Sequence, residues 1–272
     1  MYRLNSKVLK GLLCVALVSF PLMLSAQSRG VKNPLYGSKH SAVPVTSSTL
    51  KGAVFYLVSG HGGPDPGAIG KVGKISLHED EYAYDITLRL ARTLESKGAK
   101  VYMIIQDKRD GIRSDKYLKN SKTETCMGQA IPLNQVRRLQ QRCAKVNELY
   151  RRDKSRYKRA ICIHVDSRSV KQQLDVFFYY APGSTSGKRS AENMRNTFRA
   201  EYQSHQPSRG FSGTVSSRGL YMLTQTTPIT TYVELANLRN TSDQRRLLIE
   251  DNRQALANWM CQAYEKEYKS LR

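Results

Sequence analysis

The chain has 272 residues, and its 44 Lys and Arg side chains outnumber its 22 Asp and Glu side chains to give a formal net charge of +22. This length suits one α/β domain or two small ones. The positive excess favours polyanionic partners. Beyond residue 26 no apolar stretch reaches the roughly 20 residues that a membrane helix needs, so we expect no integral membrane anchor.

The first 26 residues resemble a secretory signal peptide. Three basic side chains precede an apolar run at residues 11–24, and Ala26 offers a small residue at the cleavage site. Residues 1–26 are therefore predicted to direct export to the periplasm or cell envelope of a bacterium, or secretion beyond it. Their removal leaves 44 − 3 = 41 basic against 22 acidic side chains, a net charge of +19.

A positively charged protein that is exported meets anionic cell-wall polymers before it meets nucleic acid. The chain also contains no recognisable nucleic-acid recognition motif, so we expect no nucleic-acid partner. The four cysteines that follow the signal peptide lack the C-x-x-C spacing of a structural zinc site. Export permits disulfides, and a bond between Cys126 and Cys143 stays open.

Hydrophobic periodicity predicts the elements in chain order. Residues 27–50 are rich in Ser, Lys, Gly and Pro and predict a flexible lead-in, whereas residues 107–134 are polar and aperiodic and predict a surface insertion. Between and after these segments, apolar runs alternate with helical patterns. Strands are predicted at residues 53–58, 101–105, 160–165, 174–180, 220–223 and 230–234, and helices at 81–97, 136–146, 190–202 and from 242 onward.

This alternation predicts one α/β sandwich over residues 51–272, with a mainly parallel or mixed sheet and helices on both faces. Ligands of such sheets bind beyond the carboxyl ends of the strands. His61 follows the first predicted strand, while His164 and Glu234 stand at the ends of two later ones, and Glu79 precedes the first helix.

Two imidazoles and a carboxylate are a known catalytic zinc arrangement. From spacing alone, however, a histidine at a strand end is more often structural. The glycines around His61 also suit a tight turn with positive φ. Both interpretations stay open at this point.

Local sequence motifs carry more information than the spacing. Gly60-His61-Gly62-Gly63, followed by Asp-Pro-Gly-Ala, resembles the opening motif of the zinc-dependent N-acetylmuramoyl-L-alanine amidases of the type 3 family. The resemblance continues in family order over residues 53–265. Its further motifs are Glu79 with Asp85, the helix residues Leu139, Arg142 and Asn147, the second histidine segment at 161–166, and the segment at 232–235 that holds Glu234.

The resemblance implies zinc as the cofactor, with His61, Glu79 and His164 as its ligands and Glu234 as the catalytic general base. It also implies peptidoglycan as the partner, cut between the lactyl group of N-acetylmuramic acid and L-alanine of the stem peptide. Arg142 is a candidate for contact with the substrate or for support of a ligand, against the alternative of a helix-surface cation. The sequence identifies no protein activator.

The residues next to Glu79 are alternative candidates for the zinc ligand, namely His78, Asp80 and Glu81. The spacing to Asp85 favours Glu79. Val58 occupies a position that is usually acidic in the family, which predicts the loss of a hydrogen bond that orients the first histidine. Two other functions stay open: a zinc peptidase acting on the stem, and a catalytically silent, basic wall-binding module. The retained Glu234 argues against the second.

Overall fold

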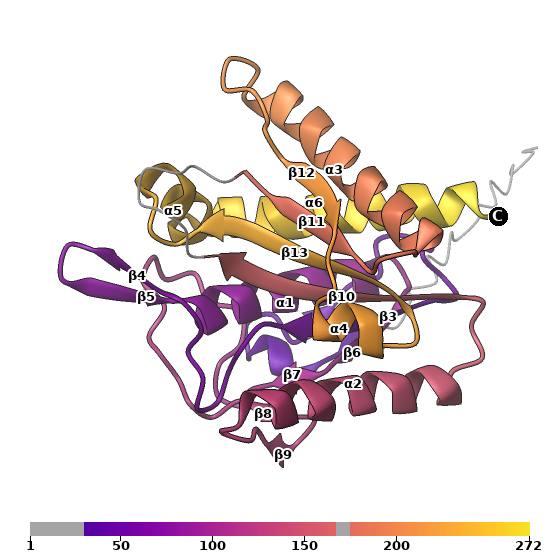
Figure 1. Cartoon of the computed structure of the whole chain (residues 1–272), viewed down its shortest axis with the longest axis horizontal. Helices are drawn as coiled ribbons and strands as arrows, with labels where there is room; N and C mark the ends of the chain where they lie inside the picture. Colours follow the sequence, from indigo (N-terminus) through magenta and orange to yellow (C-terminus); the bar gives the residue numbers. More distant parts are fainter. Residues whose placement is uncertain (1–29, 167–174) are drawn as a thin grey trace, which may run out of the picture.

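The structure is a computed structural model that describes residues 30–166 and 175–272; the predicted signal peptide lies outside the described residues. A six-stranded sheet in the order β12-β11-β13-β10-β3-β6 forms its centre (Figure 1). Four neighbouring strands are parallel, while β11 runs antiparallel to β13 and parallel to β12. In chain order the strands are β3 (Ala53–Ser59), β6 (Lys100–Met103), β10 (Tyr157–Asp166), β11 (Phe177–Tyr180), β12 (Thr214–Ser217) and β13 (Ile229–Asn237).

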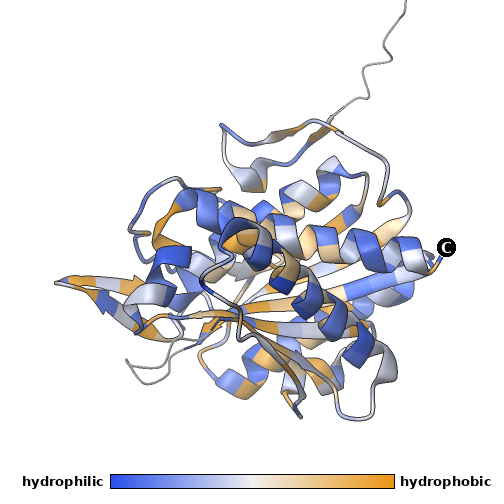
Figure 2. Ribbon diagram, turned by 90° about the horizontal axis from the view of Figure 1, so that it is seen from above, coloured by the Kyte–Doolittle hydropathy of each residue, from blue (hydrophilic) through white to orange (hydrophobic). Residues whose placement is uncertain are grey.

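Helices cover both faces of this sheet. Phe55 on β3 turns its ring towards Tyr264 of α6, with 4.8 Å between the ring centroids, whereas the next residue, Tyr56, meets Tyr150 of α2 at 6.4 Å. Apolar residues accordingly concentrate along the central strands (Figure 2). The predicted α/β sandwich with a mixed sheet is confirmed. The helices are α1 (Glu79–Ser96), α2 (Gln135–Arg152), α3 (Thr185–His205), α4 (Tyr221–Gln225), α5 (Thr241–Leu248) and α6 (Glu250–Ser270).

The described part of the predicted flexible lead-in is packed against the domain. It contains β1 (Val31–Lys32), a short 3-10 helix (Pro34–Tyr36) and β2 (Ala42–Val43). The Tyr36 side chain is fully buried, and its hydroxyl donates a hydrogen bond to Glu95 on α1 at 2.7 Å. Composition suggested a flexible segment, but a few buried side chains are enough to fix its path.

The predicted surface insertion also has internal structure. A small sheet is formed by β7 (Ile105–Gln106), β8 (Thr125–Cys126) and β9 (Gln129–Ala130). Leu118 in the insertion is buried, and its backbone N–H donates to the Tyr82 hydroxyl of α1 at 3.3 Å. The segment therefore folds back over the start of α1.

Further differences from the predicted elements concern short segments. Residues 220–223 were predicted as a strand but form the beginning of α4, which is closed by bonds from Leu223 N and Thr224 N to Leu220 O. A short apolar run does not distinguish a strand from a helical turn. The sequence also gave no indication of the hairpin formed by β4 (Ile69–Val72) and β5 (Ile75–His78).

The four cysteines within the described residues are free thiols, and all are buried, so Cys126 and Cys143 are not bonded to each other. Among the same residues, no helix combines the length and the apolar character that crossing a membrane requires.

Candidate metal centre and active site

The candidate residues gather at the carboxyl end of the parallel strands. His61 follows the end of β3, and His164 on β10 stands directly opposite Glu234 on β13 in the parallel register. Glu79 is the first residue of α1, which starts where the β4–β5 hairpin ends. The fold thus brings together four residues from four separate elements.

The Glu79 carboxylate bridges the two imidazoles. Its Oε1 lies 2.8 Å from His164 Nδ1, and its Oε2 lies 3.2 Å from His61 Nε2. One donor atom from each residue falls within 4.8 Å of the others. Backbone N–H groups of Ala68 and Val165 also donate to Glu79, at 2.8 and 3.1 Å, and fix its orientation.

The structure distinguishes Glu79 from its three neighbours. Asp80 and Glu81 are buried in a separate cluster with Glu124, and His78 belongs to neither group. Of these four residues, Glu79 contacts both histidines.

Glycines allow this close approach. A Cβ atom on Gly60 would lie 2.4 Å from Nδ1 of His164, and one on Gly67 would lie 2.7 Å from both Glu79 Oε2 and the His61 ring. Gly67 also has a φ of +68°, which favours glycine. The glycines of the motif therefore allow the turn, and their lack of a side chain leaves room for His61, Glu79 and His164 to lie close together.

Asp65 orients His61 from the side opposite Glu79. Its Oδ2 lies 2.8 Å from His61 Nδ1 and accepts a hydrogen bond from Arg138 Nη2 at 2.6 Å. No role for Asp65 or Arg138 was predicted from the sequence. The available signals were the Asp-Pro-Gly-Ala motif itself and the position of Arg138 four residues before Arg142, on the same face of α2.

Burial and these contacts shift the pKa values of the site residues. Burial alone would lower the pKa of His61, but hydrogen bonds with Asp65 and Glu79 outweigh it and raise the pKa to about 10. Burial lowers the pKa of His164, although Glu79 opposes the shift. Burial, with the negative charges of Glu79 and Asp166, raises the pKa of Glu234 well above its usual range.

A pocket of about 180 Å³ opens beside the two histidines on the α2 side of the sheet. Tyr232 forms part of its wall and stacks on the His164 ring, with centroids 4.5 Å apart. Arg142 also lines the pocket, and its Nη2 donates to the His61 carbonyl oxygen. Arg142 is 4 % exposed, so it is not the helix-surface cation of the alternative interpretation.

This donor set fits a catalytic zinc ion. Two imidazole nitrogens and one carboxylate oxygen converge from three sides, and the far nitrogen of His61 is held by a carboxylate, as is usual for zinc-binding histidines. The adjoining pocket leaves space for a substrate next to the ligands.

Comparison with known proteins identifies the family of the chain. Residues 56–266 match the model of the N-acetylmuramoyl-L-alanine amidase family. No curated protein matches the chain.

Several solved amidases share the fold at 16–20% sequence identity. The chain is similar to the amidase AmiC2 of Nostoc punctiforme, with 20% identity and a TM-score of 0.56 over 81% of this chain and 99% of that one. It is similar to the CwlD amidase of Clostridioides difficile, solved in complex with the GerS lipoprotein, with 20% identity and a TM-score of 0.57 over 81% and 100%. It is also similar to Ami1 of Mycobacterium smegmatis, with 16% identity and a TM-score of 0.58 over 81% and 99%.

The family model spans well over half of the 272 residues. The chain therefore belongs to the N-acetylmuramoyl-L-alanine amidase family and is a hydrolase of the amide bond between N-acetylmuramic acid and L-alanine in peptidoglycan.

Proposed function

We propose that this amidase depends on zinc, with His61, Glu79 and His164 as the protein ligands and Glu234 as the general base. The observation that carries the proposal is the Glu79 carboxylate placed between the two imidazoles, with Glu234 opposite His164 on the next strand. When bound, zinc supplies a Lewis acid and a water made acidic enough to react near neutral pH.

Glu234 handles the proton in this mechanism. Its carboxylate takes a proton from the water that attacks the lactyl carbonyl, and then delivers it to the leaving α-amine of L-alanine. Its burial beside negative charges strengthens its hold on a proton, which suits a group that must first collect and then donate one. One carboxylate therefore serves as base and then as acid.

Arg142 acts in this proposal as a positioning residue. It binds the main-chain oxygen of His61, so it holds the turn that presents the ligand, and its side chain lines the pocket. Contact with the substrate's own carboxyl or carbonyl groups is compatible with that location.

We also propose export as the route to the substrate. The amidases of this family act on the cell wall, and the start of the chain has the charge and apolar pattern of a signal peptide. The positive charge then favours retention on anionic wall polymers, which lengthens each encounter with peptidoglycan.

The decisive test is the chemical identity of the products. Purified mature protein is incubated with intact peptidoglycan, with and without a zinc chelator, and the fragments are identified by mass spectrometry. The expected products are whole stem peptides with a new N-terminal alanine and glycan strands of unchanged length, formed only when zinc is present. Free D-alanine as the main product would indicate a carboxypeptidase instead, and full activity after verified zinc removal would refute the zinc mechanism.

A further inference from the structure

A second group of potential ligands lies next to the proposed zinc site and takes no part in the mechanism above. Asp80 and Glu81 open α1, and Glu124 comes from the insertion that folds back over it. One carboxylate oxygen from each lies within 4.8 Å of the others, and the three side chains are only 1–5 % exposed. Three acidic side chains are rarely buried together without compensation.

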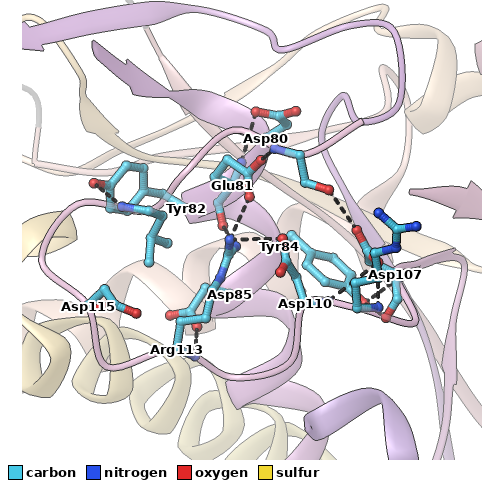
Figure 3. Close-up of polar contacts among 12 residues, drawn as sticks. Asp80, Glu81, Tyr82, Tyr84, Asp85, Asp107, Asp110, Arg113 and Asp115 are labelled. Atoms are coloured by element: carbon cyan, nitrogen blue, oxygen red, sulfur yellow. Dashed lines mark hydrogen bonds and ion pairs between the residues drawn. The ribbon is translucent and has the colours of Figure 1, made fainter. Parts of the chain in front are cut away.

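The protein groups around them compensate only part of this charge. Arg113 Nη1 pairs with Glu81 Oε2 at 2.8 Å (Figure 3). The Glu81 carboxylate also accepts a hydrogen bond from Ser121 N. Glu124 Oε2 accepts from Gly63 N at 2.8 Å. The cluster thus has one cation for three carboxylates among the contacts of the described residues.

Asp80 provides an observation that itself points to a ligand. Its Oδ1 accepts from Glu81 N at 3.0 Å, but its buried Oδ2 has no hydrogen-bond partner in the described structure. The side chain is 2 % exposed, and one of its two carboxylate oxygens belongs to the cluster. A buried carboxylate oxygen without a donor is costly, and a cation at this point would satisfy it.

We propose that Asp80, Glu81 and Glu124 form a binding site for a hard divalent cation of the Ca²⁺ or Mg²⁺ class, separate from the zinc centre. The ligands offered are all carboxylate oxygens without histidine or cysteine, a set that suits hard cations rather than zinc. The remaining coordination positions would be filled by water.

The location gives such a cation a structural role. Glu124 holds the backbone of Gly63, two residues after His61, while Asp80 follows Glu79 directly. A cation between them joins the insertion, the turn that carries His61 and the start of α1. The bound ion would therefore stabilise the segments that present two zinc ligands, without contacting the substrate.

A proton is the competing way to neutralise this cluster. Burial and the charges of Glu81 and Glu124 raise the pKa of Asp80 to about 8. With this pKa, the Asp80 carboxyl would carry a proton at neutral pH when no cation is bound. If protons alone neutralise the cluster, added Ca²⁺ or Mg²⁺ should not bind there and the Tm should not rise. If the cluster is a cation site, the added ion should displace any proton and the Tm should rise.

The experiment uses the full mature protein carrying one zinc per chain, so that the zinc site is filled. Thermal unfolding is measured in metal-free buffer and with CaCl₂ or MgCl₂ at about 10⁻³ M, a concentration that loads extracellular calcium modules. We expect the Tm to rise by about 5 °C with at least one of the two salts, and calorimetric titration to give one site per chain. NaCl at the same ionic strength as the CaCl₂ or MgCl₂ solution serves as the salt control.

The variants Asp80→Asn and Glu124→Gln keep shape and the bonds to Glu81 N and Gly63 N, but each removes a negative charge. Both should abolish the Tm gain, and both should be more stable than wild type in metal-free buffer because the repulsion is relieved. Asp110→Asn is the matched control, since Asp110 contacts Arg113 but lies outside the cluster, and it should keep the Tm gain.

No Tm rise and no binding with either salt, or a Tm rise that survives in both cluster variants, would overturn the proposal. Because the readout is binding and unfolding, failure here is distinguishable from failure of the amidase mechanism.

Discussion

Asp65 holds His61 in place through its Oδ2, which lies 2.8 Å from His61 Nδ1 and 2.6 Å from Arg138 Nη2. The sequence suggested that this chain had lost the carboxylate that orients the first histidine, because Val58 occupies an acidic position. A carboxylate nevertheless contacts the outer nitrogen of that ring. The orientation of the ligand is therefore provided from the loop after His61.

Substituting Asp65 tests this role. In Asp65→Asn the amide oxygen can still contact His61, but the negative charge is lost and Arg138 loses its carboxylate partner. Outer contacts of this kind typically change metal affinity by about 10- to 100-fold, so we expect zinc affinity to fall by about 10-fold or more. Competition with a chromophoric chelator measures the affinity, with the exposed Asp251→Asn as control. Unchanged affinity would show that Asp65 only closes the turn.

The ligand assignment makes a separate prediction for the metal content. His61→Ala and His164→Ala each remove one of three protein ligands, so neither variant should retain stoichiometric zinc after gel filtration, and activity should be lost. Circular dichroism checks that the variants fold. His205→Ala is the matched control, because the His205 side chain is 62% exposed and outside the site. Full zinc occupancy in either ligand variant would refute the assignment.

The elements and residues that were predicted correctly are those that local sequence patterns define. The strands β3, β10 and β13 are apolar runs long enough to be recognised, and strand ends of a parallel sheet meet at one edge, so His61, His164 and Glu234 could be placed together. Their chemical roles remain predictions.

The missed elements are those whose conformation depends on distant contacts. The edge strand β12 contains a single apolar residue, Val215, and four residues of weak pattern do not predict a strand. The helix α4 packs Met222 beside Cys143 of α2, a contact between residues 79 apart that no local pattern indicates. Likewise, Glu124 meets Asp80 and Glu81 only because the insertion folds back over α1.

Acid stability should depend on Asp175. This buried carboxylate accepts bonds from Ser212 Oγ at 2.9 Å and Arg246 Nη2 at 2.7 Å, and also contacts Arg209. Burial would raise its pKa, but the bonds from Ser212 and the charges of Arg246 and Arg209 outweigh burial and lower it. A depressed folded-state pKa contributes stability above the usual pKa of about 4, and this contribution is lost as the pH falls towards the folded value.

Asp175→Asn should therefore unfold more easily near neutral pH, by about 3 kcal/mol, because two arginines lose a buried partner. Between about pH 5 and pH 3 its stability should fall less steeply than that of wild type, since the titrating group is absent. Urea unfolding at several pH values measures both effects, and the exposed Asp251→Asn provides the control slope. Identical pH slopes in wild type and Asp175→Asn would contradict the prediction.

The proposed general base allows a sharper test than the ligands do, because its removal should leave the metal in place. Glu234 pairs in register with His164, yet it is not among the residues whose donor atoms converge with those of Glu79. A residue in this position can act on a water near the ligands without being one of them.

Glu234→Gln keeps the size and a hydrogen-bonding oxygen of the side chain but cannot accept the proton of the attacking water. We expect a folded protein with wild-type zinc content whose turnover of peptidoglycan falls by about 10²-fold or more. Burial already favours the uncharged form of the Glu234 carboxyl, so the uncharged Gln should leave the Tm equal to or above that of wild type. Glu148→Gln on the outer face of α2 is the control, since Glu148 forms ion pairs with Lys145 and Arg152 of the same helix and lies outside the site. Near wild-type turnover in Glu234→Gln would make Glu234 a structural strand residue, whereas lost zinc would make it a ligand; either result would overturn its role as the base.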